Sequence, residues 1–180
     1  MKRSTIDKVI STIGLIIATV LLVASIALFY TQSFIHNQVK GQLETEKIIF
    51  PATGSAAINA LPSADKIAVS KYAGQQLLTG AQAEVFADHY ISVHLNTIGG
   101  GNTYSELSQQ AIKDPTNTAL ASKVETVFRG QTLRGLLLNA YAFDTMATVA
   151  FFAACGGAIT SALLIILSLI GFSHSKKRST

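Results

Sequence analysis

Apolar residues gather near the two ends of the chain, in stretches that contain no charged side chain. The first runs from Val9 to Phe29, which as an α-helix measures roughly 31 Å and matches the hydrocarbon core of a bilayer. The second runs from Thr145 to Phe172 and measures roughly 42 Å, so it must tilt or emerge at one end. We therefore predict transmembrane helices at 9–30 and 145–172.

The first stretch also has a feature of a cleaved signal peptide, because Ser25-Ile26-Ala27 fits a small-x-small cleavage site. Signal peptides have apolar regions of about 7 to 15 residues, which are shorter than this stretch. An uncleaved anchor is therefore the favoured interpretation.

The unequal distribution of positive charge on the two sides of these stretches predicts their orientation. The flanks toward the termini carry Lys2, Arg3, Lys8, Lys176, Lys177 and Arg178. The flanks toward the intervening region hold only Lys40 and Arg134 within about 15 residues. We therefore expect tails 1–8 and 173–180 in the cytoplasm and residues 31–144 outside it, at the cell membrane. The two tails carry a net charge of +5 and the intervening region −1, so the net charge of +4 comes from the tails and nucleic acid is not an expected partner.

The intervening region carries the signals of several short helices. Apolar residues at helical spacing continue the first helix outward, and a segment rich in proline and small residues then forms a loop at 48–62. Further helices are expected to start at Ser63, at the capping-box pairs Thr79/Gln82 and Thr103/Glu106, and after Asp114-Pro115. The glycine run at 99–101 is interpreted as a turn between helices.

The stretch RGQTLRGLLLNAYAF, residues 129–143, leads into the second apolar run. Gly130 is expected to end one helix and Thr132 to cap the next. The predicted fold is therefore all-α, with two transmembrane helices, packed as an antiparallel pair, flanking an all-helical extracytoplasmic domain.

Small residues in the two apolar stretches are candidates for close helix packing. They are Gly14, Ala18, Ala153, Gly157 and Ser161, the last three at four-residue spacing. Pairing of the chain's own two spans is the favoured interpretation, and a homo-oligomeric contact is the alternative. The only cysteine, Cys155, lies in the second stretch, so the outer region forms no disulfide.

A metal site is the strongest chemical candidate, because Glu84, Asp88, His89 and His94 supply the ligands of a two-histidine, one-carboxylate centre. On one α-helix, however, the two histidines point about 140° apart. The site would need ligands from elsewhere, and His36 is the one other histidine outside the tail. We find no nucleophile motif or nucleotide-binding motif, so no catalytic residue and no cofactor is predicted.

Asp144, at the border of the second apolar stretch, is an acid in a costly position. As part of the first helical turn it would complement the helix dipole. If the helix begins earlier, Asp144 needs a cation such as Arg129 or Arg134. A structural role is favoured over a functional one.

Four blocks of sequence carry a resemblance to a known family: KIIFP, KYAGQQLLTGAQAEVFADHYISVHL, NTYSELS and VFRGQTLRGLLLNAYAF. By them the chain resembles a family of uncharacterised two-span membrane proteins of actinobacteria. The resemblance implies a double-anchored helical outer domain and no activity. Some similar proteins are labelled as ring-opening dioxygenases, but the helix geometry above offers no metal triad for that chemistry.

We expect a membrane protein whose outer domain is an interaction or accessory module for a protein partner or a second copy. The candidate surface residues are Arg129, Arg134, Tyr141, Tyr72, Gln75 and Gln76. One alternative is a metal- or small-ligand-binding domain, enzymatic in one version, that uses His89, His94 and His36. Another is an envelope protein that holds lipid phosphates with Arg129 and Arg134.

Overall fold

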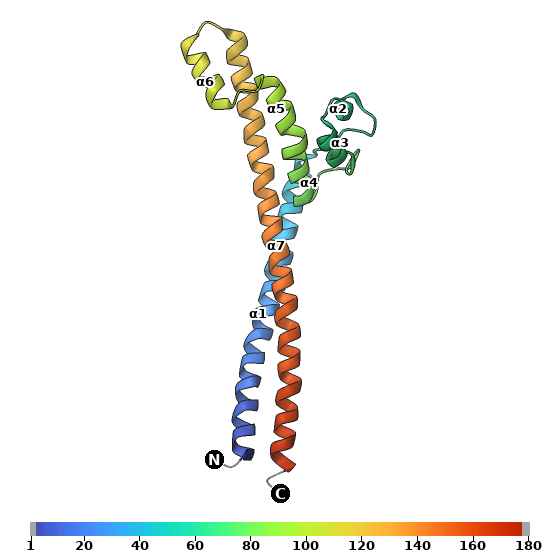
Figure 1. The fold of residues 1–180 in the computed structure, drawn as a ribbon, viewed down its shortest axis with the longest axis vertical. Helices are drawn as coiled ribbons and strands as arrows, with labels where there is room; N and C mark the ends of the chain where they lie inside the picture. Colours follow the sequence, from blue (N-terminus) through green and yellow to red (C-terminus); the bar gives the residue numbers. More distant parts are fainter. Residues whose placement is uncertain (1–2, 178–180) are drawn as a thin grey trace. The chain divides into compact units, whose positions relative to one another are not determined.

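The computed structural model describes the backbone of residues 3–177, and its regular elements are all helices. They are α1 (Arg3–Glu46), α2 (Ala56–Asn59), α3 (Ser63–Ser70), α4 (Gly80–Val85), the π-helix η1 (Phe86–Ile91), α5 (Ser92–Gly99), α6 (Tyr104–Lys113) and α7 (Thr118–Lys177). Figure 1 shows their order along the chain. The chain forms two compact units, one of residues 1–35 with 146–180 and one of residues 36–145. The all-α prediction is confirmed for the described residues.

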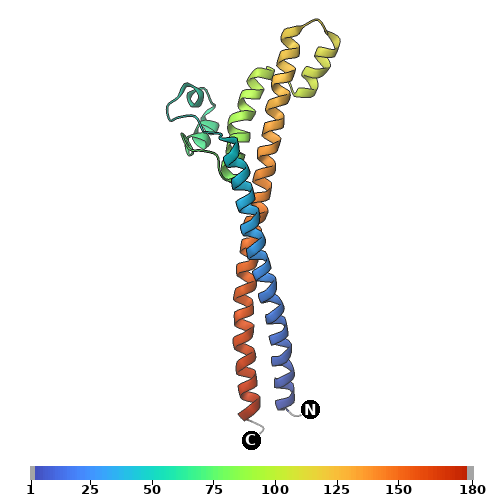
Figure 2. The same cartoon turned by 180° about the vertical axis from the view of Figure 1, so that it is seen from behind.

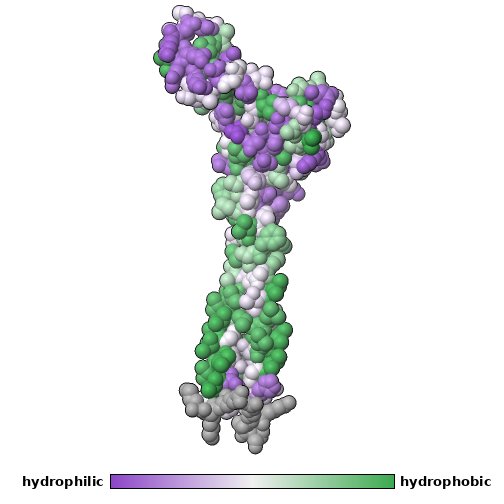
Figure 3. Space-filling view, in the orientation of Figure 1, coloured by the Kyte–Doolittle hydropathy of each residue, from purple (hydrophilic) through white to green (hydrophobic). Residues whose placement is uncertain are grey.

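The first unit contains the apolar parts of α1 and α7, side by side in Figures 1 and 2. Both helices are long and apolar enough to cross a membrane, and about 11% of the most apolar window of each is buried. Large apolar side chains cover their surface, as Figure 3 shows in green. Of the flanking cations, Lys2 and Arg178 lie outside the described residues, as do the side chains of Arg3 and Lys177.

Serine and glycine fit into one another along the seam between these two helices. A Cβ atom added to Gly157 would lie 2.4 Å from Ser25 Oγ, and Gly14 meets Ser168 in the same way. The Ser161 hydroxyl donates a 2.7 Å hydrogen bond to the carbonyl oxygen of Ala18. Small residues therefore let the two backbones approach closely, and the Ser161 hydroxyl can then donate to a carbonyl oxygen of the other helix.

The buried positions of this seam recur every seven residues. On α1 they are Ser11, Ala18 and Ser25, and on α7 they are Ala147, Ala154, Ser161, Ser168 and Ser175. This is the repeat of helices that wrap around one another, and it differs from the four-residue spacing expected from the sequence. Ala153, part of the expected row, is exposed.

The second unit is built around the helical run from α4 through η1 to α5. The Thr79/Gln82 and Thr103/Glu106 capping boxes start α4 and α6 as predicted. Gly100 and Gly101 have φ values of 63° and 80°, and they form the expected turn between α5 and α6. The core of this second unit consists of Phe50, Val69, Leu77, Phe86, Leu107 and Val127.

The structure corrects the prediction of a break at residues 130–132, because α7 continues through them. Gly130 serves close packing, since an added Cβ would lie 2.3 Å from Leu95 Cδ2. The Thr132 hydroxyl donates to the carbonyl oxygen of Phe128 instead of capping a helix. A glycine inside a helix is tolerated where it allows such a contact.

The sequence pattern ADKIAVSKYAGQQLL after Ser63 is that of one helix, but the helix in the structure is shorter. It ends at Ser70, and Gly74 then adopts a positive φ of 72°. Residues 75–77 extend alongside residues 48–50 through backbone hydrogen bonds, such as the one from Phe50 N–H to the Gln75 carbonyl oxygen at 2.9 Å. The turn allows this pairing because glycine adopts positive φ without strain.

Candidate functional site

An open apolar groove lies between α1 and α7 in the unit of residues 36–145. Its volume is about 430 Å³, within the range of small-molecule sites. Its lining residues are Val39, Gln42, Leu43, Thr45, Glu46, Ile48, Leu133, Leu136, Leu137, Asn139, Ala140 and Phe143. A second hollow, beside Asn102 and Gln131, has a volume of about 150 Å³ and falls below that range. The larger groove is therefore the candidate site.

Helix periodicity explains the apolar walls of the groove. On α7, Leu133, Leu136, Ala140 and Phe143 repeat at intervals of three and four residues and therefore share one face. On α1, Val39 and Leu43 are four residues apart and both are buried. Leu136 stays 61% exposed and Phe143 55% exposed. The groove therefore presents large apolar side chains that this chain does not cover.

The sequence spacing of the seam also reaches the groove. Counting in sevens from the buried Ala147 back along α7 gives Ala140 and Leu133, and counting forward from Ser25 along α1 gives Gln32 and Val39. Leu133, Gln32 and Val39 are larger than the serine and alanine of the seam and keep two helices from close contact, whereas Ala140 stays small. The same repeat thus predicts close packing in one unit and an open space in the other.

Polar side chains stand among the apolar lining. Gln42, Thr45 and Asn139 are uncharged, and Glu46 is the one charged residue in the described lining. No lysine or arginine lines the groove in the described part of the chain. The groove is therefore suited to an apolar chain with a neutral polar group, and it offers no counter-ion to an anion.

Asp144 lies next to this groove in the sequence and joins three elements of the second unit. Its Oδ1 is 2.9 Å from His36 Nδ1 on α1, and its Oδ2 accepts a 3.0 Å hydrogen bond from the Gly80 N–H at the start of α4. The Asp144 side chain is only 16% exposed. Its contacts are those of a structural acid that holds α1, α4 and α7 together.

The helix-dipole explanation for Asp144 is corrected by these contacts. Since α7 begins at Thr118, Asp144 is far from its first turn, and it lies at the start of α4 instead. The cationic partner that the structure shows beside it is His36 when protonated, in place of the expected Arg129 or Arg134.

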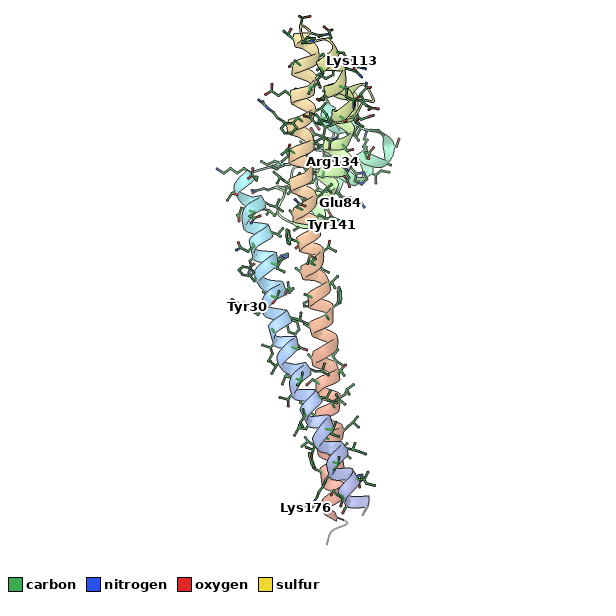
Figure 4. The ribbon with its side chains drawn as sticks, turned by 90° about the vertical axis from the view of Figure 1, so that its left-hand side faces the viewer. Tyr30, Glu84, Lys113, Arg134, Tyr141 and Lys176 are labelled. Carbon is green, nitrogen blue, oxygen red and sulfur yellow. The ribbon has the colours of Figure 1, made fainter. Side chains whose placement is uncertain are left out.

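The two arginines each contact a carboxylate of the same unit. Arg134, labelled on α7 in Figure 4, donates through Nη2 and Nε to Asp88 Oδ1, at 2.6 and 3.1 Å, and thereby joins α7 to η1. Arg129 pairs with Glu125 one turn earlier on α7, where both side chains are exposed. Asp88, named above as a possible metal ligand, is therefore the partner of an arginine.

The three candidate histidines lie in three separate contacts. His36 Nδ1 contacts Asp144, and His89 Nδ1 lies 2.7 Å from Asp65 Oδ1 on α3. His94 Nδ1 lies 2.8 Å from the Tyr90 carbonyl oxygen, and its ring packs on the Tyr90 ring. Among the described residues, no group of three or more histidine, cysteine or acidic side chains could hold a metal ion.

The π-helix η1 is a feature that the sequence did not predict. Ser92 N–H bonds back to the Ala87 carbonyl oxygen, five residues earlier. The wider turn changes the angle between neighbouring side chains, and Asp88 then contacts α7 while His89 contacts α3. Such π-turns within helices are often found at functional sites, and here this one joins two elements.

Three of the other predicted surface residues lie in the loop after α3 and contact residues of the same unit. Tyr72 packs its ring on Phe50, and Gln75 Oε1 accepts a hydrogen bond from Gln82 Nε2. Gln76 Nε2 donates to the Glu44 carbonyl oxygen near the end of α1. Tyr141 is exposed on α7, where Figure 4 labels it. All three loop residues follow the end of α3 and do not lie on a helix.

The carboxyl group of Glu106 has a lowered pKa. The pKa of Glu106 is lowered from its ordinary value of 4.5, because its carboxylate accepts hydrogen bonds from the Thr103 backbone N–H and hydroxyl group. This is the capping box of α6, which favours the ionised form of Glu106. It is an effect on helix stability, far from the lining of the groove.

No protein-family model matches the chain, and no curated protein or solved structure matches it. The resemblance to actinobacterial two-span membrane proteins therefore stays an expectation from the sequence.

Proposed function

We propose that the protein is a two-span membrane protein whose helical outer domain, residues 31–144, binds an apolar ligand in the groove between α1 and α7. The observation that carries the proposal is the groove itself, an open space of about 430 Å³ with a mostly apolar lining. This function differs from the protein-interaction module favoured from the sequence and is closer to the small-ligand-binding alternative, without a role for the histidines.

The contacts within the first unit support an antiparallel pairing of the two spans. Ser4 contacts Ser175, Ala18 contacts Ser161 and Phe29 contacts Phe151, so residue numbers rise along α1 as they fall along α7. The predicted orientation, with both termini in the cytoplasm of a cell-membrane protein, rests on the cationic flanks.

A ligand in the groove would remove exposed apolar surface from water. Complete burial of a leucine or phenylalanine side chain stabilises by about 1.5–3 kcal/mol. Leu136 and Phe143 are each a little more than half exposed, so covering both would contribute about 2–3 kcal/mol. An apolar occupant therefore has a physical reason to bind there.

The metal-binding and lipid-phosphate alternatives receive less support from the contacts. Metal binding would need His36, His89 and His94 to share an ion, and each has its own partner. Binding of lipid phosphates by Arg129 and Arg134 would compete with their carboxylate partners.

Cysteine protection in native membranes tests the proposal. In a Cys155→Ala background, a Leu136→Cys variant places a thiol in the groove, and an Ile112→Cys variant on α6 is the matched control at an exposed site. With a small maleimide, we expect Leu136→Cys to react about tenfold more slowly than Ile112→Cys, because an occupant covers the groove. Equal rates in membranes would contradict the proposal.

A further inference from the structure

We infer that the occupant of the groove is one acyl chain of a bilayer phospholipid whose headgroup stays outside the groove. The inference rests on the proposed function and names the class of its ligand. Three properties of the groove support this inference: its size, the charge of its lining, and the residues of α7 that follow the lining in the sequence.

The size of the groove favours a single chain over a protein segment. Twelve residues line it, whereas a stable protein interface uses about 20–30 residues on each side. Its volume of about 430 Å³ lies in the lower part of the range for small-molecule sites. A second helix, about 10–12 Å across with its side chains, would need a wider surface.

The charge of the lining favours a bilayer phospholipid over a free fatty acid. A free carboxylate would enter a groove whose one charged lining residue is Glu46, and it would meet like charge there. A phospholipid chain carries no charge of its own, because its phosphate lies in the headgroup. Gln42, Thr45 and Asn139 can then bond to water or to the ester group near the start of the chain.

Along the sequence of α7, the lining of the groove ends close to the second uncharged stretch. Phe143, in the lining, stands two residues before the uncharged stretch begins at Thr145. Next along the helix, Met146 is 60% exposed, so large apolar side chains continue outside the groove. The one charge between them, Asp144, is directed to His36 and Gly80. Between Phe143 and Met146, α7 therefore carries no charge other than this hydrogen-bonded acid.

Photo-crosslinking of the full chain tests the inference. The protein is reconstituted in vesicles of phosphatidylethanolamine and phosphatidylglycerol that contain a small share of phosphatidylcholine with a diazirine near the end of one acyl chain. After illumination, peptides that carry the lipid are identified by mass spectrometry. We compare the unchanged protein with Leu136→Glu and the milder Leu136→Gln in the groove, and with Ile112→Glu at an exposed site outside it.

We expect lipid adducts within residues 39–48 or 133–143, in addition to those in the spans. Leu136→Glu should lower the groove adducts about tenfold, because a charge in an apolar groove disfavours the chain. Leu136→Gln should lower them less, and Ile112→Glu should leave them unchanged. Adducts within the spans serve as the internal standard in each sample.

Adducts confined to the spans, or groove adducts that Leu136→Glu and Leu136→Gln leave unchanged, would overturn the inference. These results are distinguishable from failure of the proposed function. If the thiol of Leu136→Cys is protected in membranes but no groove adduct forms, the groove has another occupant. If that thiol is not protected, the proposed function itself fails.

Discussion

Replacement of Gly80 by alanine should destabilise the unit of residues 36–145, although alanine is a good helix former. Gly80 is the first residue of α4, where its N–H donates to Asp144 Oδ2 at 3.0 Å. An added Cβ would lie 2.4 Å from Asp144 Cβ and 2.8 Å from Oδ2, so α4 and α7 must move apart there. The Gly80→Ala change therefore damages the junction that holds His36, Asp144 and α4 together.

The magnitude follows from two effects at this contact. Overpacking in a well-packed site costs about 1–3 kcal/mol. Loss of a hydrogen bond to a charged group costs about 1.5–3 kcal/mol, part of which water recovers because Asp144 is 16% exposed. We expect a total loss of about 2–4 kcal/mol in the free energy of unfolding. At Gly135 on α7, nothing lies within 4 Å of an added Cβ, so Gly135→Ala should gain about 0.5–1 kcal/mol.

Thermal unfolding of the full chain in detergent, followed by circular dichroism, measures both changes. For a chain of this length, 1 kcal/mol corresponds to about 2–4 °C in Tm. Gly80→Ala should therefore lower Tm by about 5–15 °C, and Gly135→Ala should raise it by about 1–4 °C. If Gly80→Ala raises Tm as Gly135→Ala does, the tight contact between α4 and α7 is wrong.

Three further predictions address other contacts. Arg134→Gln should cost about 1 kcal/mol, because its pair with the η1 carboxylate is about two-thirds buried, whereas Arg129→Gln should cost about 0.3–0.5 kcal/mol; denaturant titration compares them. Because the pKa of Glu106 is lowered in the folded state, its ionised carboxylate stabilises the protein above the unfolded pKa, and this stability is lost as the pH falls through the folded pKa. On acidification below about pH 5, the Tm of Glu106→Gln should therefore fall less than that of the unchanged protein. In a Cys155→Ala background, Ser25→Cys with Gly157→Cys should form a disulfide within one chain, because their Cβ atoms would be 3.7 Å apart; a disulfide-linked dimer on a non-reducing gel would refute pairing of the spans within one chain.

Local signals in the sequence predicted local structure well. The capping boxes at Thr79 and Thr103 started their helices as expected, because each depends on residues only three positions apart. The two long apolar helices were readable from the uncharged stretches. The break expected at Gly130 was wrong, because the contact that explains this glycine comes from Leu95, which is distant in the sequence.

The candidate site was harder to predict than the helices. The groove lies between α1 and α7, and the sequence signals its position only by the larger residues Gln32, Val39 and Leu133 in the seven-residue repeat. The contact between His36 and Asp144 joins residues 108 positions apart, which no local pattern reveals. The π-helix likewise has no sequence signature that we used.

Labelling of single cysteines in intact cells tests most directly whether the domain that holds the groove lies outside the cytoplasm on two spans. Ser122→Cys is exposed near the start of α7, and Ser173→Cys is exposed just after the second uncharged stretch, each in a Cys155→Ala background. A membrane-impermeant maleimide should label Ser122→Cys in intact cells and Ser173→Cys only after permeabilisation. Labelling of Ser173→Cys in intact cells, with Ser122→Cys protected until permeabilisation, would contradict the account.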